Sequence, residues 1–318
     1  MLKVQNISFS YLNTKTLRDI NFSIESSSIV AIIGESGCGK STLLKLIYGL
    51  YDLDEGQIFW NENEVLGPKF HLIPGMDFMK YLAQDFDLMP FITVSENVGK
   101  FLSNVNFIEK QKRINEVLEV VEMKNFATTK AKNLSGGQMQ RVALAKVLAL
   151  EPQILLLDEP FSHIDNFRKN SLRRNIFAYA KEKKITILFA THDSTDVLSF
   201  ADEVIVMKDG LMLDKIATKD CYENPKSKYV ASLFGDVNEI SSTFFNTKSK
   251  IPNFIYPHQL KVVAHSKLKV IVKNNYYRGS HHLVEAEIDS KIIFFESNIS
   301  FIVGSIIFLE LVSNELNN

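Results

Sequence analysis

The stretch that decides the fold is Gly34-Glu35-Ser36-Gly37-Cys38-Gly39-Lys40-Ser41, which satisfies the pattern G-x-x-x-x-G-K-[ST] and predicts a phosphate-binding loop. The glycines permit backbone conformations in which successive N–H groups point at phosphate oxygens, and the positive end of a following helix adds to that field. Lys40 supplies a point charge, and the Ser41 hydroxyl is a hard-oxygen ligand for Mg²⁺. The residues expected to hold the phosphates are Gly34, Ser36, Gly37, Cys38, Gly39, Lys40, Ser41 and Thr42.

The residues on either side of this loop predict an α/β fold. Residues 29–33 form a continuous apolar run that suits a strand buried on both faces, and residues 41–50 have helical periodicity. Strand, glycine loop and helix are the opening of a βαβ unit. Two further buried runs, 154–157 and 185–190, extend the predicted parallel sheet. Helical periodicity dominates residues of about 85–150, which we interpret as an inserted helical subdomain.

An acidic pair follows one of these buried runs. Asp158 emerges at the carboxyl end of the strand, where open α/β sheets place their ligands, and would help to hold Mg²⁺. Glu159 stands one residue further on, where it could orient and activate an attacking water. An acidic pair after a strand is by itself more often a turn or a helix cap, so this interpretation depends on the phosphate loop.

The stretch Leu134-Ser135-Gly136-Gly137-Gln138 identifies the kind of phosphate-loop protein. Ser135 and Gln138 have the spacing of a capping box, but a capping box does not require two consecutive glycines. Gly136 and Gly137 open backbone N–H groups at a helix N-terminus and so predict a second phosphate-binding surface. At this point the sequence resembles the ATP-binding cassette (ABC) ATPases, whose LSGGQ signature is complete here and continues into residues 139–145.

The resemblance implies ATP and Mg²⁺ as the bound nucleotide and metal, and it implies roles for further residues. Gln84 matches the glutamine that senses Mg²⁺ and water and couples to the membrane subunit. His192 matches the switch histidine that contacts the γ-phosphate, and Tyr11 the aromatic residue that stacks on adenine. Asp165 matches the D-loop aspartate, although His163 departs from the usual wording SALD of that loop.

The resemblance also implies a dimer. In this family two cassettes meet head to tail, so that the phosphate loop of one faces the LSGGQ of the other with ATP between them. Ser135, Gly136, Gly137 and Gln138 would therefore act on the nucleotide of a second copy. ATP would close the dimer and hydrolysis would release it, as in other switches that depend on a γ-phosphate.

The residue pattern changes near Gly235. Short alternating segments separated by turn signals follow, among them 267–273, 282–288, 291–296 and 303–311, with turns expected at 274–275 and 289–290. We therefore expect an ABC ATPase domain over 1–235 and a small all-β, OB-like domain over 236–318. This appendage resembles the TOBE domain of maltose-, iron(III)- and polyamine-type importer ATPases. Residues 256–260 and 277–279 depart from the motifs usual there.

Composition limits the alternatives. Lys and Arg number 36 against 37 Asp and Glu, and this net charge of −1 argues against nucleic-acid partners. Two cysteines are too few for a disulfide framework. The chain begins without a basic-then-apolar signal region, and no apolar run approaches the roughly 20 residues of a membrane-spanning helix. We expect a peripheral protein on the cytoplasmic face of the membrane.

These observations favour the ATPase subunit of an importer. Its expected partners are transmembrane permease subunits and, indirectly, a solute-binding protein, with residues 89–98 as a candidate permease contact. Iron(III) or a polyamine is the preferred cargo, ahead of molybdate, sulfate or a sugar. Two alternatives stay open: an exporter cassette, disfavoured by the β appendage, and a soluble ABC ATPase acting on ribosomes or DNA, disfavoured by the single cassette and the neutral charge.

Overall fold

The computed structural model describes residues 1–312 apart from residues 13, 72, 84 and 246–253. The chain divides into two compact units, Met1–Thr218 and Lys219–Asn318. Among the described residues, no helix combines the length and the apolar character that crossing a membrane requires.

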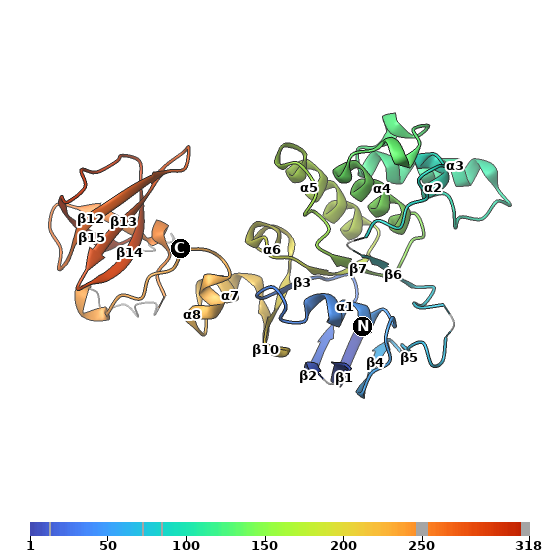
Figure 1. Ribbon diagram of the computed structural model, residues 1–318, viewed down its shortest axis with the longest axis horizontal. Coiled ribbons are helices and arrows are strands. Elements are labelled where there is room, and N and C mark those ends of the chain that lie inside the picture. Colours follow the sequence, from blue (N-terminus) through green and yellow to red (C-terminus); the bar gives the residue numbers. More distant parts are fainter. Residues whose placement is uncertain (13, 72, 84, 246–253, 313–318) are drawn as a thin grey trace. The chain divides into compact units, whose positions relative to one another are not determined.

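A six-stranded sheet forms the centre of the first unit (Figure 1). Its strand order is β10 (Leu211–Ala217), β9 (Glu203–Lys208), β3 (Ile29–Ile33), β8 (Thr186–Ala190), β7 (Ile154–Asp158) and β6 (Met79–Leu82). The strands from β9 to β6 are parallel, and β10 is an antiparallel edge. Every residue of β3, β7 and β8 is buried, as expected for strands that are covered on both faces. The parallel sheet predicted from the apolar runs is therefore confirmed.

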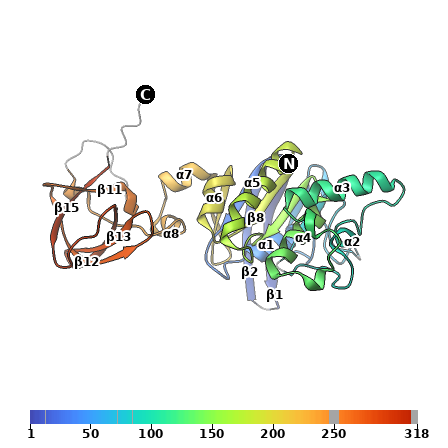
Figure 2. The ribbon, with the colours of Figure 1, turned by 90° about the horizontal axis from the view of Figure 1, so that it is seen from above.

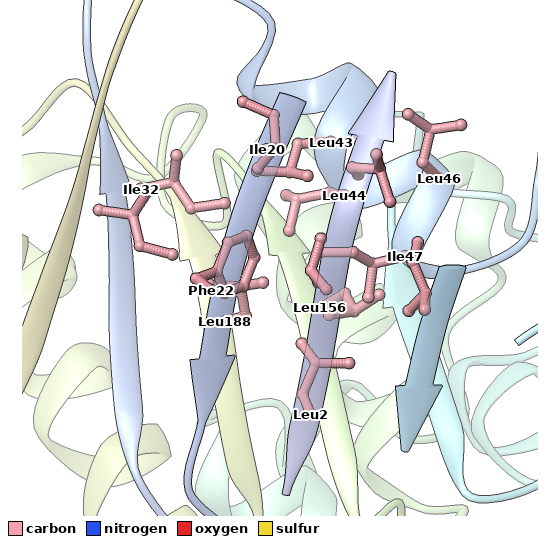
Figure 3. Packing of buried hydrophobic residues seen from close by; sticks show 14 of the residues in the cluster. Leu2, Ile20, Phe22, Ile32, Leu43, Leu44, Leu46, Ile47, Leu156 and Leu188 are labelled. Atoms are coloured by element: carbon pink, nitrogen blue, oxygen red, sulfur yellow. The ribbon is translucent and has the colours of Figure 1, made fainter. Parts of the chain in front are cut away.

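A second, antiparallel sheet packs against one face of the first through a helix. It consists of β2 (Thr14–Ile24), β1 (Leu2–Tyr11), β4 (Glu55–Trp60) and β5 (Asn63–Glu64). Helix α1 (Lys40–Ile47) lies between the two sheets, and Figure 3 shows its leucines among side chains from both. Because both sides of α1 are covered, most of its residues are buried, and the helix that begins at the phosphate loop is fixed by the core.

Helices cover the other face of the six-stranded sheet (Figures 1 and 2). These are α2 (Val94–Val98), α3 (Phe107–Val120), α4 (Gly136–Leu148) and α5 (Asn166–Glu182), with the short 3-10 turns Lys124–Phe126 and Ala131–Asn133. Helix α6 (Ser194–Phe200) follows β8. Arg113 of α3 joins three of them. Its guanidinium donates to the carbonyls of Leu148 and Ala149 at the end of α4 and to the hydroxyl of Tyr179 in α5. The helices predicted within residues 85–150 are present.

The second unit contains a five-stranded antiparallel sheet with the order β11 (Leu260–Val263), β15 (Ile306–Leu311), β12 (Leu268–Tyr277), β13 (His282–Ile288) and β14 (Lys291–Ser297). Helices α7 (Thr218–Glu223) and α8 (Lys228–Ser232) and the 3-10 turns Ser242–Phe244 and Pro257–Gln259 precede these strands. One face of the sheet holds a separate apolar core that includes Val270, Val284 and Phe295. The small all-β module is thus present.

One turn in this module was predicted wrongly. Residues 274–275 lie inside β12, which continues to Tyr277 past a register shift between Val272 and Asn274. Asparagine pairs are common in turns, but here a bulge absorbs the extra residue and the pairing with β13 continues. The turn expected at 289–290 is present, and Asp289 and Ser290 both have positive φ, 47° and 64°.

Candidate active site

Three strand ends create the site. In the parallel register Asp158 of β7 pairs with Ala190 of β8, and Ala190 pairs with Ile32 of β3. The carboxyl ends of these strands therefore lie level at one edge of the sheet, which is where open α/β sheets bind ligands. The phosphate loop, the acidic pair and His192 all follow these ends directly.

The phosphate loop requires its glycines for two separate reasons. Gly37 and Gly39 have φ of 83° and 106°, in the region that residues with a Cβ rarely adopt. Gly34 meets a neighbour as well, because a Cβ there would lie 2.2 Å from the carbonyl oxygen of Met207. The loop is thus held against β9 in the glycine-rich shape that directs N–H groups at phosphate oxygens, although the N–H of Cys38 bonds to the carbonyl of Glu35 at 3.3 Å.

Positive charge gathers inside this loop. The Lys40 ammonium donates to the carbonyls of Gly34 and Glu35, at 2.8 and 2.9 Å, so it lies across the loop rather than in solvent. No acidic residue occupies the first turn of α1, so its positive N-terminal end is not neutralised locally. Burial raises the pKa of the neighbouring Cys38 thiol, with Lys40 acting in the opposite direction. Cys38 is therefore a neutral filler beneath the loop.

Ser41 and Asp158 come together, although 117 residues separate them in the sequence. The Ser41 hydroxyl donates to a carboxylate oxygen of Asp158 at 2.9 Å, and the Tyr81 hydroxyl donates to the other oxygen at 3.3 Å. A hydroxyl and a carboxylate are hard oxygen donors that suit Mg²⁺, which takes its remaining ligands from phosphates and water. These residues fit the Mg²⁺ that the sequence resemblance implies. Burial, followed by the nearby Asp158 charge, raises the pKa of Tyr81, which keeps it a neutral donor.

Glu159 and His192 form a pair beside this position. Nδ1 of His192 lies 2.8 Å from a carboxylate oxygen of Glu159, whose side chain is 20% exposed, whereas the histidine is 71% exposed. The Glu159 backbone has φ of 50°, a left-handed conformation that is costly for glutamate. A carboxylate and an imidazole at this distance can hold and orient a water molecule or transfer a proton.

Charges on α5 hold the loop that carries His192. The carboxylate of Asp193 pairs with Lys169 at 2.9 Å and with Arg173 at 2.5 Å. Burial would raise the pKa of Asp193, but these two cations hydrogen-bond to it and hold its pKa well below the ordinary value. The neighbouring Asp196 also pairs with Arg173. His192 thus projects from a loop that is clamped immediately behind it.

Tyr11 lies at the outer end of β1 in a cluster of rings. Its ring is edge-on to Phe9 and Tyr51, with centroid distances of 4.8 and 5.4 Å, and its hydroxyl bonds to the side chain of Thr42. Tyr11 as a whole remains 38% exposed. An exposed aromatic face beside the phosphate loop can stack on a base.

The LSGGQ stretch lies elsewhere. It begins α4, on the face of the six-stranded sheet opposite α1 (Figure 1). Ser135 accepts from the backbone N–H of Gln138, and the Gln138 side chain accepts from the N–H of Ser135, so the capping box is present. Nothing lies within 4 Å of a Cβ built on Gly136, whereas one on Gly137 would lie 2.7 Å from the carbonyl oxygen of His163.

The predicted site residues therefore fall into two groups. One chain brings together the phosphate loop, Asp158, Glu159, His192 and Tyr11, whereas the LSGGQ residues occupy the opposite face. Asp165 is exposed at the start of α5. Gln84 lies outside the described residues. Two residues of the site were not predicted from the sequence. Tyr81 donates a hydrogen bond to the Asp158 carboxylate, and the Gln140 amide donates one to the backbone carbonyl of Glu159. Gln140 stands two residues after LSGGQ, but no local pattern in the sequence signals its contact with Glu159.

The comparisons with known proteins agree with this geometry. The family model described as ABC transporter matches residues 17–162. The Fe(3+) ions import ATP-binding protein FbpC of Mannheimia succiniciproducens is 35% identical over 77% of this chain and 68% of its own length. The sulfate/thiosulfate import ATP-binding protein CysA of Mesostigma viride is 36% identical over 83% and 75%, and the spermidine/putrescine import ATP-binding protein PotA of Pasteurella multocida is 30% identical over 86% and 75%.

Solved structures are similar to about two thirds of the chain. An ATP-binding cassette dimer in a post-hydrolysis state, bound to ADP and Pi, superposes with a TM-score of 0.61 at 29% identity. The match covers 69% of this chain and 99% of that one. The cbiO1 protein of Clostridium perfringens, part of a cbiONQ transporter complex, gives the same score at 30% identity, over 69% of this chain and 89% of its own.

Proposed function

Because the chain belongs to the ABC transporter family of ATP-hydrolysing, Mg²⁺-dependent cassettes, we propose that it powers an importer whose membrane permease is a separate chain. The observation that carries the ATPase half of this proposal is the meeting of Lys40, Ser41 and Asp158 at one edge of the sheet. The similarity to import ATP-binding proteins, over two thirds or more of their length, supports the importer half.

In the proposed mechanism, each group acts where the structure places it. The loop N–H groups and Lys40 bind the β- and γ-phosphates, and Tyr11 stacks on the adenine. Ser41 and Asp158 would hold Mg²⁺, which would supply positive charge against the phosphates. Glu159 accepts a proton from the attacking water while His192 fixes the carboxylate and contacts the γ-phosphate.

A second copy completes the site. The N-terminus of α4 offers Ser135 and Gly136 at an open surface, but on the face of the sheet away from the phosphate loop. Head-to-tail pairing of two chains would present this helix end to the partner's nucleotide, with Asp165 near the same interface. The dimeric cassette structures similar to this chain support that arrangement.

The helical subdomain offers the surface for the permease. Three phenylalanines of this subdomain are unusually exposed to water: Phe91 by 71%, Phe101 by 59% and Phe107 by 67%. The buried Asn97 amide fixes the segment before them by bonding to both backbone groups of Met89. A cavity of about 310 Å³, lined in part by Phe86, Phe101 and Lys146, adjoins this surface. Apolar side chains of a permease segment would fill it from the cytoplasmic face of the membrane.

The cargo is proposed as iron(III) or a polyamine. The relatives named for Fe(3+), for spermidine and putrescine, and for sulfate and thiosulfate are 30–36% identical, so identity alone does not separate them. Selection would belong to the solute-binding protein and the permease, whose surfaces contact the cargo.

The experiment that tests the partner is affinity purification of the chain from detergent-solubilised membranes. We expect transmembrane permease subunits in the purified complex, and we expect Phe91→Ser together with Phe101→Ser to lose them while the free chain still hydrolyses ATP. Recovery of ribosomes or DNA in place of a permease would contradict the proposal.

A further inference from the structure

Gln140 is a buried residue that contacts the backbone of Glu159, one member of the Glu159–His192 pair. It belongs to α4, little more than a turn beyond the start of that helix, and is only 3% exposed. Its amide nitrogen donates to the backbone carbonyl of Glu159 at 3.0 Å, and its amide oxygen accepts from the backbone N–H of His163 at 3.1 Å. A buried amide with both ends bonded to backbone groups fixes those groups relative to its own helix.

The group that it holds has a strained conformation. Glu159 has φ of 50°, which for a residue with a Cβ costs on the order of 1–2 kcal/mol. Its N–H donates to Ala190 at 3.0 Å, and its carbonyl accepts from Ser162 as well as from Gln140. The two peptide groups around Glu159 are therefore tied from opposite sides. Because the side-chain direction follows the backbone, these bonds determine where the carboxylate points.

We propose that Gln140 is a positioning residue for ATP hydrolysis: it holds the Glu159 backbone in the strained conformation that aims the carboxylate at the attacking water. This inference rests on the proposed role of Glu159 as the activating base. Gln140 does not touch the substrate, so its effect is on turnover and not on nucleotide binding. The same amide accepts from the N–H of His163, whose carbonyl lies close to Gly137, so α4, the loop at His163 and Glu159 are joined by direct contacts.

Two variants separate positioning from simple loss of packing. Gln140→Met keeps the length and the apolar stem but removes both hydrogen bonds. We expect its kcat to fall by roughly tenfold, since the strained Glu159 loses one of its restraints, while its Kd for ATP stays within twofold of the native chain. A parallel change in kcat and Kd, or an unchanged kcat, would overturn the inference.

Gln140→Glu tests the positioning role through the pH dependence of kcat, which a purely structural role of Gln140 would not change. As a carboxylate it repels the Glu159 carbonyl oxygen, but when protonated it can donate to that oxygen and still accept from His163. Because burial favours the neutral form, this protonation falls within an accessible pH range. We expect the ratio of variant to native kcat to rise several-fold from pH 8 to pH 6. A ratio independent of pH contradicts the positioning role, and if this variant does not fold, the kcat and Kd of Gln140→Met decide.

The native chain and the Gln140→Glu variant contain the same other ionisable groups near position 140. Among the described residues around this amide, these are Asp158 and Glu159 at the end of β7, His163 before α5, His192 after β8, and Arg141 on α4 itself. Gln140→Met keeps all of these groups and has no ionisable side chain at position 140, so the ratio of its kcat to the native kcat should not rise from pH 8 to pH 6.

Asn238 in the second unit provides a matched control. It is 2% exposed, and its amide also bridges two backbone groups, donating to the carbonyl of Phe294 and accepting from its N–H, both at 2.7 Å. Asn238→Asp should therefore reduce stability without changing kcat or its pH dependence. If the native chain does not hydrolyse ATP, or if Glu159→Gln hydrolyses it normally, the proposed function fails; native hydrolysis with unaffected Gln140 variants contradicts this inference alone.

Discussion

At the scale of single residues, the site separates binding from turnover. Lys40 and Ser41 are the proposed contacts of the phosphates and of Mg²⁺, while Glu159 and His192 form a pair at 2.8 Å and are the proposed hydrolytic groups. Substitutions in the two sets should therefore have different consequences.

Glu159→Gln keeps the shape of the side chain but removes its ability to accept a proton. We expect ATP binding to persist and the turnover number to fall by roughly 10²–10⁴-fold, the usual contribution of a general base. Equilibrium binding of labelled ATP and steady-state hydrolysis measure the two quantities. Normal hydrolysis by this variant would remove Glu159 from the mechanism.

Lys40→Ala removes the charge inside the phosphate loop. Charge-assisted hydrogen bonds contribute about 1.5–3 kcal/mol, so the Kd for ATP should rise by roughly 10- to 100-fold. Glu35 is exposed and its carbonyl can bond to water instead, whereas the carbonyl of Gly34 is buried and loses its partner, so we also expect a modest loss of stability and the Kd is measured on folded protein. Calorimetric titration with ATP measures the change, and unaltered affinity would contradict the assignment of the loop.

Asp193→Asn tests the clamp behind His192. In the folded state Lys169 and Arg173 hold the pKa of Asp193 below its unfolded value of about 3.9, so the carboxylate stabilises the fold above that pH and the contribution is lost as pH falls. Asparagine keeps the helix cap to Thr195 and removes only the charge. We expect the variant to be less stable by about 1–3 kcal/mol at pH 7, with the difference shrinking below about pH 4. Urea unfolding at several pH values measures it, and a constant difference would count against the ion pairs.

The sequence predicts the local parts of this site better than the distant ones. Residues 34–42 form one motif, and Asp158 follows a recognisable buried strand, so their meeting at one sheet edge follows from the parallel order of strands. Tyr81 and Gln140 could not be predicted in this way. Their contacts to Asp158 and Glu159 depend on how an edge strand and a helix are placed, which no local pattern specifies.

At the scale of elements, the first turn of α4 is constrained both by its N-terminal cap and by the loop packed against it. Ser135 caps its first turn, Gly136 faces open space, and Gly137 lies against the D-loop. The two adjacent glycines therefore have different reasons to be glycine, although the sequence presents them as one motif.

Alanine at each position should reveal this difference. Gly137→Ala would bring a Cβ to 2.7 Å from the carbonyl oxygen of His163, and we expect a loss of roughly 1–3 kcal/mol in the free energy of unfolding. Gly136→Ala meets nothing within 4 Å and should leave stability unchanged or slightly higher, since alanine favours a helix. Thermal unfolding of both variants measures this, and equal effects would contradict the described approach of the D-loop.

Several helices and strands with a clear hydrophobic pattern were predicted from the sequence, and others were not. The buried runs of β3, β7 and β8 and the helical face of α3 were found from the sequence. The strands β6, β9 and β10 were not predicted: β6 has only four residues and β10 is partly exposed, so their patterns are weak, whereas the buried run of β9 was overlooked. The bulge in β12 shows the same limit: local turn propensity at residues 274–275 is overridden by pairing with β13.

At the scale of the whole molecule, the chain combines an ATPase unit with a β module, each with its own apolar core. The site in one chain lacks the helix end that LSGGQ would provide, so the proposed working form is a pair of cassettes on a permease. The claim that joins these levels is that ATP hydrolysis by this chain drives solute entry.

Uptake of radiolabelled solutes tests that claim most directly. Cells that lack this chain would be supplied with either the native protein or Glu159→Gln, at equal expression, and offered iron(III), spermidine, sulfate, molybdate and maltose. The native chain should restore ATP-dependent entry of one solute, with iron(III) or spermidine expected, and Glu159→Gln should restore none. Equal uptake with and without the native chain for every solute, or full uptake with Glu159→Gln, would contradict the account.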